Sequence, residues 1–226
     1  MLRLFALGRR KDSLTRPEYH DSLLHRHAPL VEACESFQRF CRRYHQNHVM
    51  GPIDASAPDE LRQGQARFDN CSEFWFDDLD VLLKTFNHPS YLATVRPDEP
   101  NWTDGTSRVA FLAEETEIST GRHGRATTKV LALVPGTSGV PDLSSWALPS
   151  IPGCVRHIEN RVLGQLDFQK GQLAGAEDLP FVHLSELWFE SPLDIREWLA
   201  AGGAEALRSQ SSLGRIALWA NEHVIF

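Results

Sequence analysis

The chain has 226 residues, of which 42% are apolar and 23% charged, and it carries a net charge of −7 at neutral pH. This length suits one large domain or two of about 110 residues. The negative charge argues against nucleic-acid and anionic-membrane partners, because both require a basic surface. No apolar stretch approaches the roughly 20 residues of a membrane helix. The four cysteines form no C-x-x-C pair, which predicts reduced thiols in a soluble, cytoplasmic protein.

A short sequence occurs twice and divides the chain into halves. Residues 72–76 read SEFWF, and residues 185–189 read SELWF, 113 positions later. The same offset relates five further identical pairs, namely Cys41 and Cys154, Arg43 and Arg156, Asn47 and Asn160, Val49 and Val162, and Gly51 and Gly164. A period this long indicates a duplicated domain, since solenoid repeats span roughly 20–50 residues. We therefore predict an N-terminal repeat over residues 1–120 and a C-terminal repeat over residues 121–226.

The first half begins with an apolar strand at 2–8. Thr15 and Glu18 then form a capping box, which predicts a helix whose apolar face carries Leu23, Leu24, Leu30, Val31 and Phe37. Pro29 should kink or break that helix. Strands are expected at 40–50, 67–76 and 107–116, a surface loop at 52–64, and a short helix at 79–86, capped by Asp77 or Asp78. This β-α-β-β-α-β order is ferredoxin-like.

The second half repeats the order. Strands are expected at 127–134, 155–164, 181–189 and 213–226, a helix at 192–208, and at most a short helix within 136–149. Each ferredoxin-like module leaves one sheet face uncovered, so the two sheets should pack together as an α+β barrel within one chain.

Two segments carry a family resemblance. Residues 19–30 (YHDSLLHRHAPL) and 98–104 (DEPNWTD) resemble the first helix and the acidic segment of EthD-domain proteins, and the repeated Glu-(Phe/Leu)-Trp-Phe resembles a strand of that family. Ser22 and Leu23 stand where the family usually has Tyr and Trp. The second half has no His-Ala-Pro-Leu counterpart.

The resemblance implies the dimeric α/β-barrel fold, completed here by duplication, with a single site in the first half. It also implies chemistry of the kinds found in this fold. The family includes polyketide dehydratases and proteins of ether degradation, and related barrels include lactone isomerases, monooxygenases without cofactors and haem-binding enzymes.

His27 is the predicted catalytic residue. Helical spacing places it with His20, Leu24, Leu30 and Val31 on the face towards the sheet, where a histidine can move a proton near neutral pH. The alternative is a core histidine bonded to a carbonyl freed by Pro29. Asp98, Glu99 and Asp104 are candidate carboxylates to orient it, and we take Asp104 as the catalytic partner. Trp102 is a candidate aromatic wall, and the expected substrate contacts are Tyr19, His20, Leu24, Glu99 and Trp102.

Other titratable residues are expected to be structural. His25 is two residues before His27, which places it roughly 200° away round the helix axis, so its side chain should be solvated. His45 and His48 are three apart on a strand and face opposite ways, which argues against a shared metal site. Glu73 and Glu186 are candidates for buried acids of raised pKa, and their occurrence in both halves favours a structural role. No metalloprotease, nucleophile-elbow, phosphate-loop or dinucleotide motif occurs.

These observations predict a lyase or isomerase, dehydratase-like, that uses His27 as general acid and base on an apolar cyclic or aromatic small molecule, with no metal or cofactor. The alternatives are a cofactor-independent oxygenase, a haem-binding member of the same fold, or a non-catalytic binding module. Homodimer formation is left open.

Overall fold

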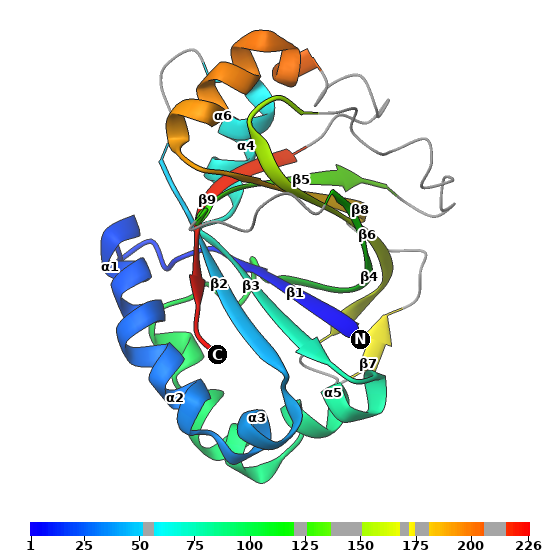
Figure 1. Ribbon diagram of the computed structural model, residues 1–226. Coiled ribbons are helices and arrows are strands. Elements are labelled where there is room, and N and C mark those ends of the chain that lie inside the picture. The colour runs from blue at the N-terminus through cyan, green and yellow to red at the C-terminus, as the bar shows by residue number, and fades with distance from the viewer. Residues whose placement is uncertain (52–56, 120–125, 137–150, 168–171, 175–180, 206–215) are drawn as a thin grey trace.

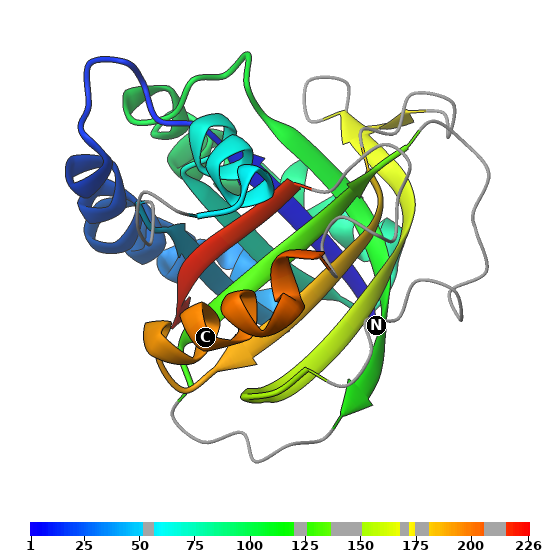
Figure 2. The same ribbon diagram turned by 90° about the horizontal axis from the view of Figure 1, so that it is seen from above.

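The computed structural model describes residues 1–51, 57–119, 126–136, 151–167, 172–174, 181–205 and 216–226. A barrel of antiparallel strands forms its centre, with helices on opposite sides (Figures 1 and 2). Among the described residues, no helix is both long and apolar enough to cross a membrane. All four cysteine thiols are free.

Eight antiparallel strands close the barrel, as predicted. They follow the order β4-β1-β3-β2-β9-β5-β8-β6, and β6 pairs with β4 to complete the circle, while the short β7 extends β6 alone. The strands are β1 (Leu2–Gly8), β2 (Arg43–Val49), β3 (Asn70–Phe76), β4 (Val109–Ser119), β5 (Thr128–Pro135), β6 (Cys154–Asp167), β7 (Gln172–Ala174), β8 (Phe181–Phe189) and β9 (Ile216–Val224).

Side chains fill the barrel interior. Alternate strand residues point inward, and Phe5, Phe111, Leu131 and Leu184 are among the buried residues that pack there. The rings of Phe5 and Phe111 stack with centroids 5.3 Å apart. Since small barrels are packed cores, a ligand site has to lie between the outer face of the sheet and the helices.

Helices of the first half cover the outer face of β1 to β4. They are α1 (Arg16–Ser22), the π-helical turn η1 (Leu23–His27), α2 (Ala28–Ala33), α3 (Glu35–Phe40), α5 (Leu79–Phe86), the π-helical turn η2 (Tyr91–Val95) and the 3-10 turn η3 (Glu99–Asn101). The predicted capping box is present, because the Thr15 N–H donates to the Glu18 carboxylate at 2.8 Å and the Thr15 hydroxyl accepts from the Glu18 N–H. Asp78 caps α5 through the Val81 N–H at 2.8 Å.

The helix passes Pro29 without a break. It widens at η1, where the Ala28 N–H donates to the Leu23 carbonyl five residues earlier, and Pro29 then occupies the first turn of α2, where the missing N–H costs little. A π turn contains more residues than an α turn, so it shifts the buried face. That face follows Tyr19, Leu23, His27 and Val31, each four positions from the last.

Two helices, α4 (Asp59–Arg67) and α6 (Pro192–Trp198, continued by the π turn η6, Leu199–Gly203), cover the other side of the barrel (Figure 1). The prediction of a loop at 52–64 is wrong from Asp59 onward, where α4 begins. Residues 52–56 lie outside the described part of the chain. Asp59 and Glu60 suit a first helical turn because they complement its dipole. Gly64 is a contact point, since a Cβ there would lie 2.0 Å from the Ala217 carbonyl oxygen.

The remaining predictions for the second half are met where it is described. The strand expected at 181–189 has these bounds. The helix expected from 192 begins at Pro192, behind a Ser191 capping box, while its predicted end, 206–208, lies outside the described residues. The predicted connection at 136–149 also lies outside them, apart from residue 136.

Hydrogen bonds recur at the 113-residue offset. The Asn47 side-chain amide donates to Glu73 Oε1 at 2.6 Å, and that of Asn160 donates to Glu186 Oε1 at 2.8 Å. The same two amides donate to main-chain carbonyls 24 residues further on, at 2.8 and 3.2 Å. Strand order recurs as well, as β4-β1-β3-β2 in the first half and β9-β5-β8-β6 in the second.

Candidate active site

Two adjoining cavities lie between the first-half sheet and its helices. The inner cavity has a volume of about 70 Å³ and is lined by strand residues such as Tyr44 and Ser72 and by His27 and Trp102. The outer cleft has a volume of about 1020 Å³. The two share five lining residues, Phe86, Tyr91, Glu99, Thr103 and Arg108. The two cavities therefore adjoin each other.

His27 lines the inner cavity at the end of η1. It is 6% exposed, its Nδ1 lies 3.1 Å from Asp98 Oδ2, and its ring meets Trp102 edge-on with centroids 4.6 Å apart. In the described part of the chain, Nε2 of His27 has no hydrogen-bond partner. The imidazole is thus held from one side, and its other nitrogen is open to a ligand.

Asp98 holds the imidazole. Its Oδ2 also accepts a hydrogen bond from Trp102 Nε1 at 2.9 Å. The hydrogen bond with His27 lowers the pKa of Asp98 to about 2, and those from Trp102 and Asn101 act in the same direction against partial burial. The carboxylate is therefore ionised at neutral pH and favours the tautomer with the proton on Nδ1. This leaves the Nε2 lone pair free to accept a proton.

A second polar group lies on the cavity wall. Glu99 accepts hydrogen bonds on both oxygens, from the Tyr91 hydroxyl at 2.7 Å and from Arg108 at 2.5 Å. Burial and the neighbouring Glu99 raise the pKa of Tyr91 well above its ordinary value, so the phenol keeps its proton.

The structure brings together three of the predicted site residues, His27, Trp102 and Glu99. Tyr19 is fully buried behind them, where its hydroxyl donates to Asn70 Oδ1 at 2.5 Å and its ring lies 5.6 Å from that of Trp102. It supports the wall and does not line either cavity.

His20 and Leu24 do not reach the cavity, because η1 shifts the helix register. Nε2 of His20 lies 2.9 Å from the main-chain carbonyl oxygen of Asp69, and the His20 ring stacks on that of His48 with centroids 4.5 Å apart. Leu23 takes the buried position that α-helical spacing gives to Leu24. His25 is exposed, as expected.

Asp104 does not orient His27. Its carboxylate accepts hydrogen bonds from the Thr106 N–H at 3.0 Å and from the Thr106 hydroxyl at 2.8 Å, so it closes its own turn. These bonds lower the pKa of Asp104. The partner of His27 is Asp98, the first of the three candidate carboxylates.

Sequence reasoning missed several lining residues, namely Tyr44, Asn70, Ser72, Tyr91 and Arg108. Tyr44 lies on β2, and Asn70 and Ser72 lie on β3. Because residues two apart on a strand point to the same side of the sheet, the sequence could have placed Asn70 and Ser72 together on the face that the helices cover. Tyr91 and Arg108 belong to a turn and to a strand entry, where no periodic pattern marks a pocket residue.

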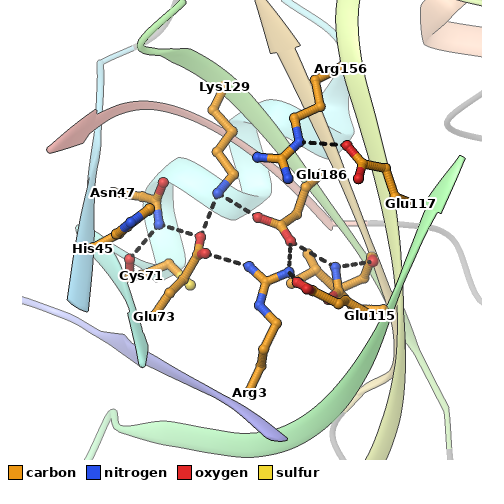
Figure 3. A network of polar contacts seen from close by, with 12 residues as sticks. Arg3, His45, Asn47, Cys71, Glu73, Glu115, Glu117, Lys129, Arg156 and Glu186 are labelled. Carbon is orange, nitrogen blue, oxygen red and sulfur yellow. Dashed lines mark hydrogen bonds and ion pairs between the residues drawn. The ribbon is translucent and has the colours of Figure 1, made fainter. Parts of the chain in front are cut away.

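Glu73 and Glu186 lie elsewhere, in a charged cluster inside one end of the barrel (Figure 3). Both are fully buried, and each contacts Arg3 and Lys129 at 2.5 Å. Burial and the Glu186 charge raise the pKa of Glu73. Burial would also raise that of Glu186, but Arg3 and Lys129 outweigh it and lower the pKa to about 2.

The same cluster contains a set of atoms with metal-like spacing. One ligand atom each from His45, Glu73 and Glu222 lies within 4.8 Å of the others. However, the Lys129 ammonium already contacts Glu73 Oε1 at 2.5 Å and Glu222 Oε1 at 3.2 Å. Three carboxylates raise the pKa of Lys129 against the effect of burial, so this lysine supplies the positive charge. His45 and His48 face opposite sides of β2, since His45 contacts Glu222 and His48 contacts His20.

The fold is found in known structures. The chain is similar to an anthrone oxidase-like protein, with a TM-score of 0.64 and 14% identity over 99% of this chain and 93% of that one. It is also similar to a proposed monooxygenase from Lactobacillus acidophilus NCFM, with a TM-score of 0.49 and 8% identity over 98% and 92% of the two chains. At 14% identity, the likeness to the anthrone oxidase-like protein establishes a shared fold alone. No curated protein matches the sequence.

A family model covers the candidate site. Residues 11–106 match the EthD domain, and this segment contains His27, Asp98, Glu99 and Trp102. The chain therefore contains a segment, residues 11–106, that matches the EthD domain and that supplies both the histidine and its carboxylate.

Proposed function

We propose that the protein is an enzyme that removes a proton from a small cyclic or aromatic molecule, with His27 as the general base. One observation carries the proposal, namely that Nδ1 of His27 is held by the ionised Asp98 while Nε2 stands open at the cavity wall. The nearby rings of Trp102, Phe86 and Phe74 suit a flat apolar ligand.

The first step is the same for every reaction that we consider. Nε2 of His27 takes a proton from a carbon next to a carbonyl group, and the electrons of the C–H bond form a carbanion delocalised onto the carbonyl oxygen. Asp98 stabilises the imidazolium that results, as a carboxylate does for a histidine base. Because Trp102 and Asn101 also donate to Asp98, the carboxylate is fixed before the substrate binds.

Two outcomes of this step are candidates. In a lyase or isomerase, a leaving group departs or the proton returns at another carbon, and oxygen is not consumed. In a cofactor-independent oxygenase, the carbanion reduces O₂, so that a CH₂ group and O₂ yield C=O and water. One structural neighbour is described as anthrone oxidase-like, so the oxygenase is tested on equal terms with the lyase or isomerase.

Turnover with anthrone under air distinguishes these outcomes. The oxygenase consumes one O₂ per carbonyl formed, whereas the lyase or isomerase leaves dissolved oxygen unchanged. In either case His27→Gln should abolish turnover while the melting temperature stays nearly unchanged, and Asp98→Asn should reduce it. Full activity in His27→Gln would refute the proposed base. A Soret band in the purified protein would instead support a haem-binding member.

We also infer that the chain arose by duplication, with ferredoxin-like repeats over residues 1–120 and 121–226. The recurring strand order and the equivalent bonds of Asn47 and Asn160 support this. The ion pairs Arg3–Glu186 and Lys129–Glu73 join the two halves. Expressed as separate chains, the halves should associate with each other, and stable, monodisperse single halves would count against the inference.

A further inference from the structure

Arg108 has hydrogen-bond donors to spare at the cavity wall. It lines both the inner cavity and the outer cleft, and its side chain is 27% exposed. A guanidinium carries five N–H donors. Within the described residues, only Glu99 accepts from it, at 2.5 Å. The other donors can therefore meet a ligand.

Glu99 presets the orientation of Arg108. One oxygen of Glu99 accepts from Arg108, and the other is occupied by the Tyr91 hydroxyl at 2.7 Å. Tyr91 is 5% exposed and remains a phenol, since burial and Glu99 raise its pKa. Donors that are fixed before the reaction stabilise developing charge without reorganisation.

One turn of the chain connects this cation with the base. Asp98 and Glu99 are adjacent residues at the start of η3, and they bind His27 and Arg108 respectively. Both of these side chains line the inner cavity. A ring compound that spans this cavity of about 70 Å³ and the adjoining cleft of about 1020 Å³ therefore meets a proton acceptor and a guanidinium, each held by its own carboxylate.

We propose that Arg108 binds the anionic oxygen that forms when His27 removes a proton, so that the substrate is a ring compound with an enolisable carbonyl or a phenolic hydroxyl. This rests on the proposed function. The C–H electron pair becomes the C=C bond of an enolate, the C=O π pair moves to oxygen, and the proton moves to Nε2 of His27. Arg108 donates to that O⁻ and binds it more strongly than the neutral carbonyl. Glu99 is a positioning residue.

Arg108 lies just outside residues 11–106, the segment that matches the EthD domain. It also differs from an ordinary surface pair such as Arg42–Asp77, whose side chains are 52% and 46% exposed. Arg42 lines neither cavity and serves as the matched control.

Binding of 4-nitrophenol tests the proposal without turnover, because its phenolate absorbs visible light and its phenol does not. In wild-type protein the apparent pKa of the bound phenol should lie at least about one unit below that of the free phenol, a tenfold preference for the anion. Arg108→Gln should abolish the shift, Arg108→Lys should keep part of it, and Glu99→Gln, which removes the carboxylate that orients the guanidinium, should reduce it. Arg42→Gln should match wild type.

An unchanged shift in folded Arg108→Gln would overturn the proposal, and a full shift in Glu99→Gln would refute the positioning role of Glu99. His27→Gln separates the two claims. If Arg108 stabilises the anion, the shift persists in His27→Gln even though that variant cannot accept a proton. A shift that disappears in His27→Gln and persists in Arg108→Gln would assign the anion to the imidazolium and refute the role of Arg108.

Discussion

Asp98 and Glu99 are neighbours in the chain, yet their carboxylates bind different walls of the same cavity. Oδ2 of Asp98 lies 3.1 Å from Nδ1 of His27, and Oε2 of Glu99 lies 2.5 Å from Arg108. The short turn η3 thus fixes the base and the cation relative to each other. Small changes at this turn should alter chemistry more than folding.

Replacing Asp98 by Asn should make stability less dependent on acid pH. The pKa of Asp98 is about 2 in the native protein, against 3.8 ordinarily. Its charged form therefore stabilises the fold above about pH 4, and this contribution is lost as the pH falls towards 2. Urea unfolding of wild type and Asp98→Asn should differ most at neutral pH and converge near pH 2. A constant difference across that range would contradict the assigned pKa.

Replacing Trp102 by Phe tests the support of the carboxylate. The change removes the Nε1–H bond to Asp98 and keeps an aromatic wall. Hydrogen bonds to charged groups contribute about 1.5–3 kcal/mol, so kcat should fall about tenfold or more with a smaller change in KM. Trp198→Phe, on α6 at the far side of the barrel, is the control and should keep the activity per folded molecule. Equal kcat in Trp102→Phe and wild type would refute this role.

His48 should make the fold sensitive to mild acid. Burial, with the nearby His20, His223 and His25, lowers the pKa of His48 to about 2, and burial lowers those of His20 and His223 as well. The unfolded chain binds protons below about pH 6.5 and the native His48 does not, so stability is present above that pH and falls below it.

Each such histidine contributes a slope of up to about 1.4 kcal/mol per pH unit. Urea unfolding between pH 7.5 and 4.5 should therefore show a smaller loss of stability in His48→Gln than in wild type. His88→Gln, at a histidine outside this cluster that contacts Ser90, serves as the comparison. Parallel curves for wild type and His48→Gln would show that His48 is protonated in the native state.

The buried charges in the barrel should be strongly coupled. Lys129→Met leaves Glu73 and Glu186 without one of their two cations, and breaking a buried pair costs about 3–5 kcal/mol. Adding Glu73→Gln should recover part of the loss, because it removes an uncompensated charge. Chemical denaturation of the single and double variants measures this coupling. Additive losses would show that the two residues act independently.

Local signals in the sequence predicted much of the fold. The capping box at Thr15 and the Asp78 cap are readable because the deciding contacts lie within a few residues. The barrel was predictable from the repeat, since each predicted sheet has one apolar face that its own helices do not cover and that the other sheet can bury. Helix α4 was missed because Gly64 was taken as a loop residue. Its lack of a side chain instead allows close packing against Ala217, which is distant in sequence.

The site was predictable in kind but not in detail. The resemblance pointed to His27 and Trp102, which line one cavity, whereas Asp98 could not be preferred to Asp104 without the turn that directs each carboxylate. His20 and Leu24 were misplaced because nothing in the sequence marks the π turn at Leu23–His27. Arg108 was missed because only the folded turn brings Glu99 to it.

Proton abstraction by His27 can be measured directly by hydrogen–deuterium exchange into 2-tetralone in D₂O without oxygen, because exchange at carbon requires no later step. Wild-type protein should accelerate deuterium uptake next to the carbonyl, as followed by mass spectrometry, and His27→Gln should reduce the rate to that of buffer. An equal rate in wild type and His27→Gln, or no acceleration by wild type, would contradict the account.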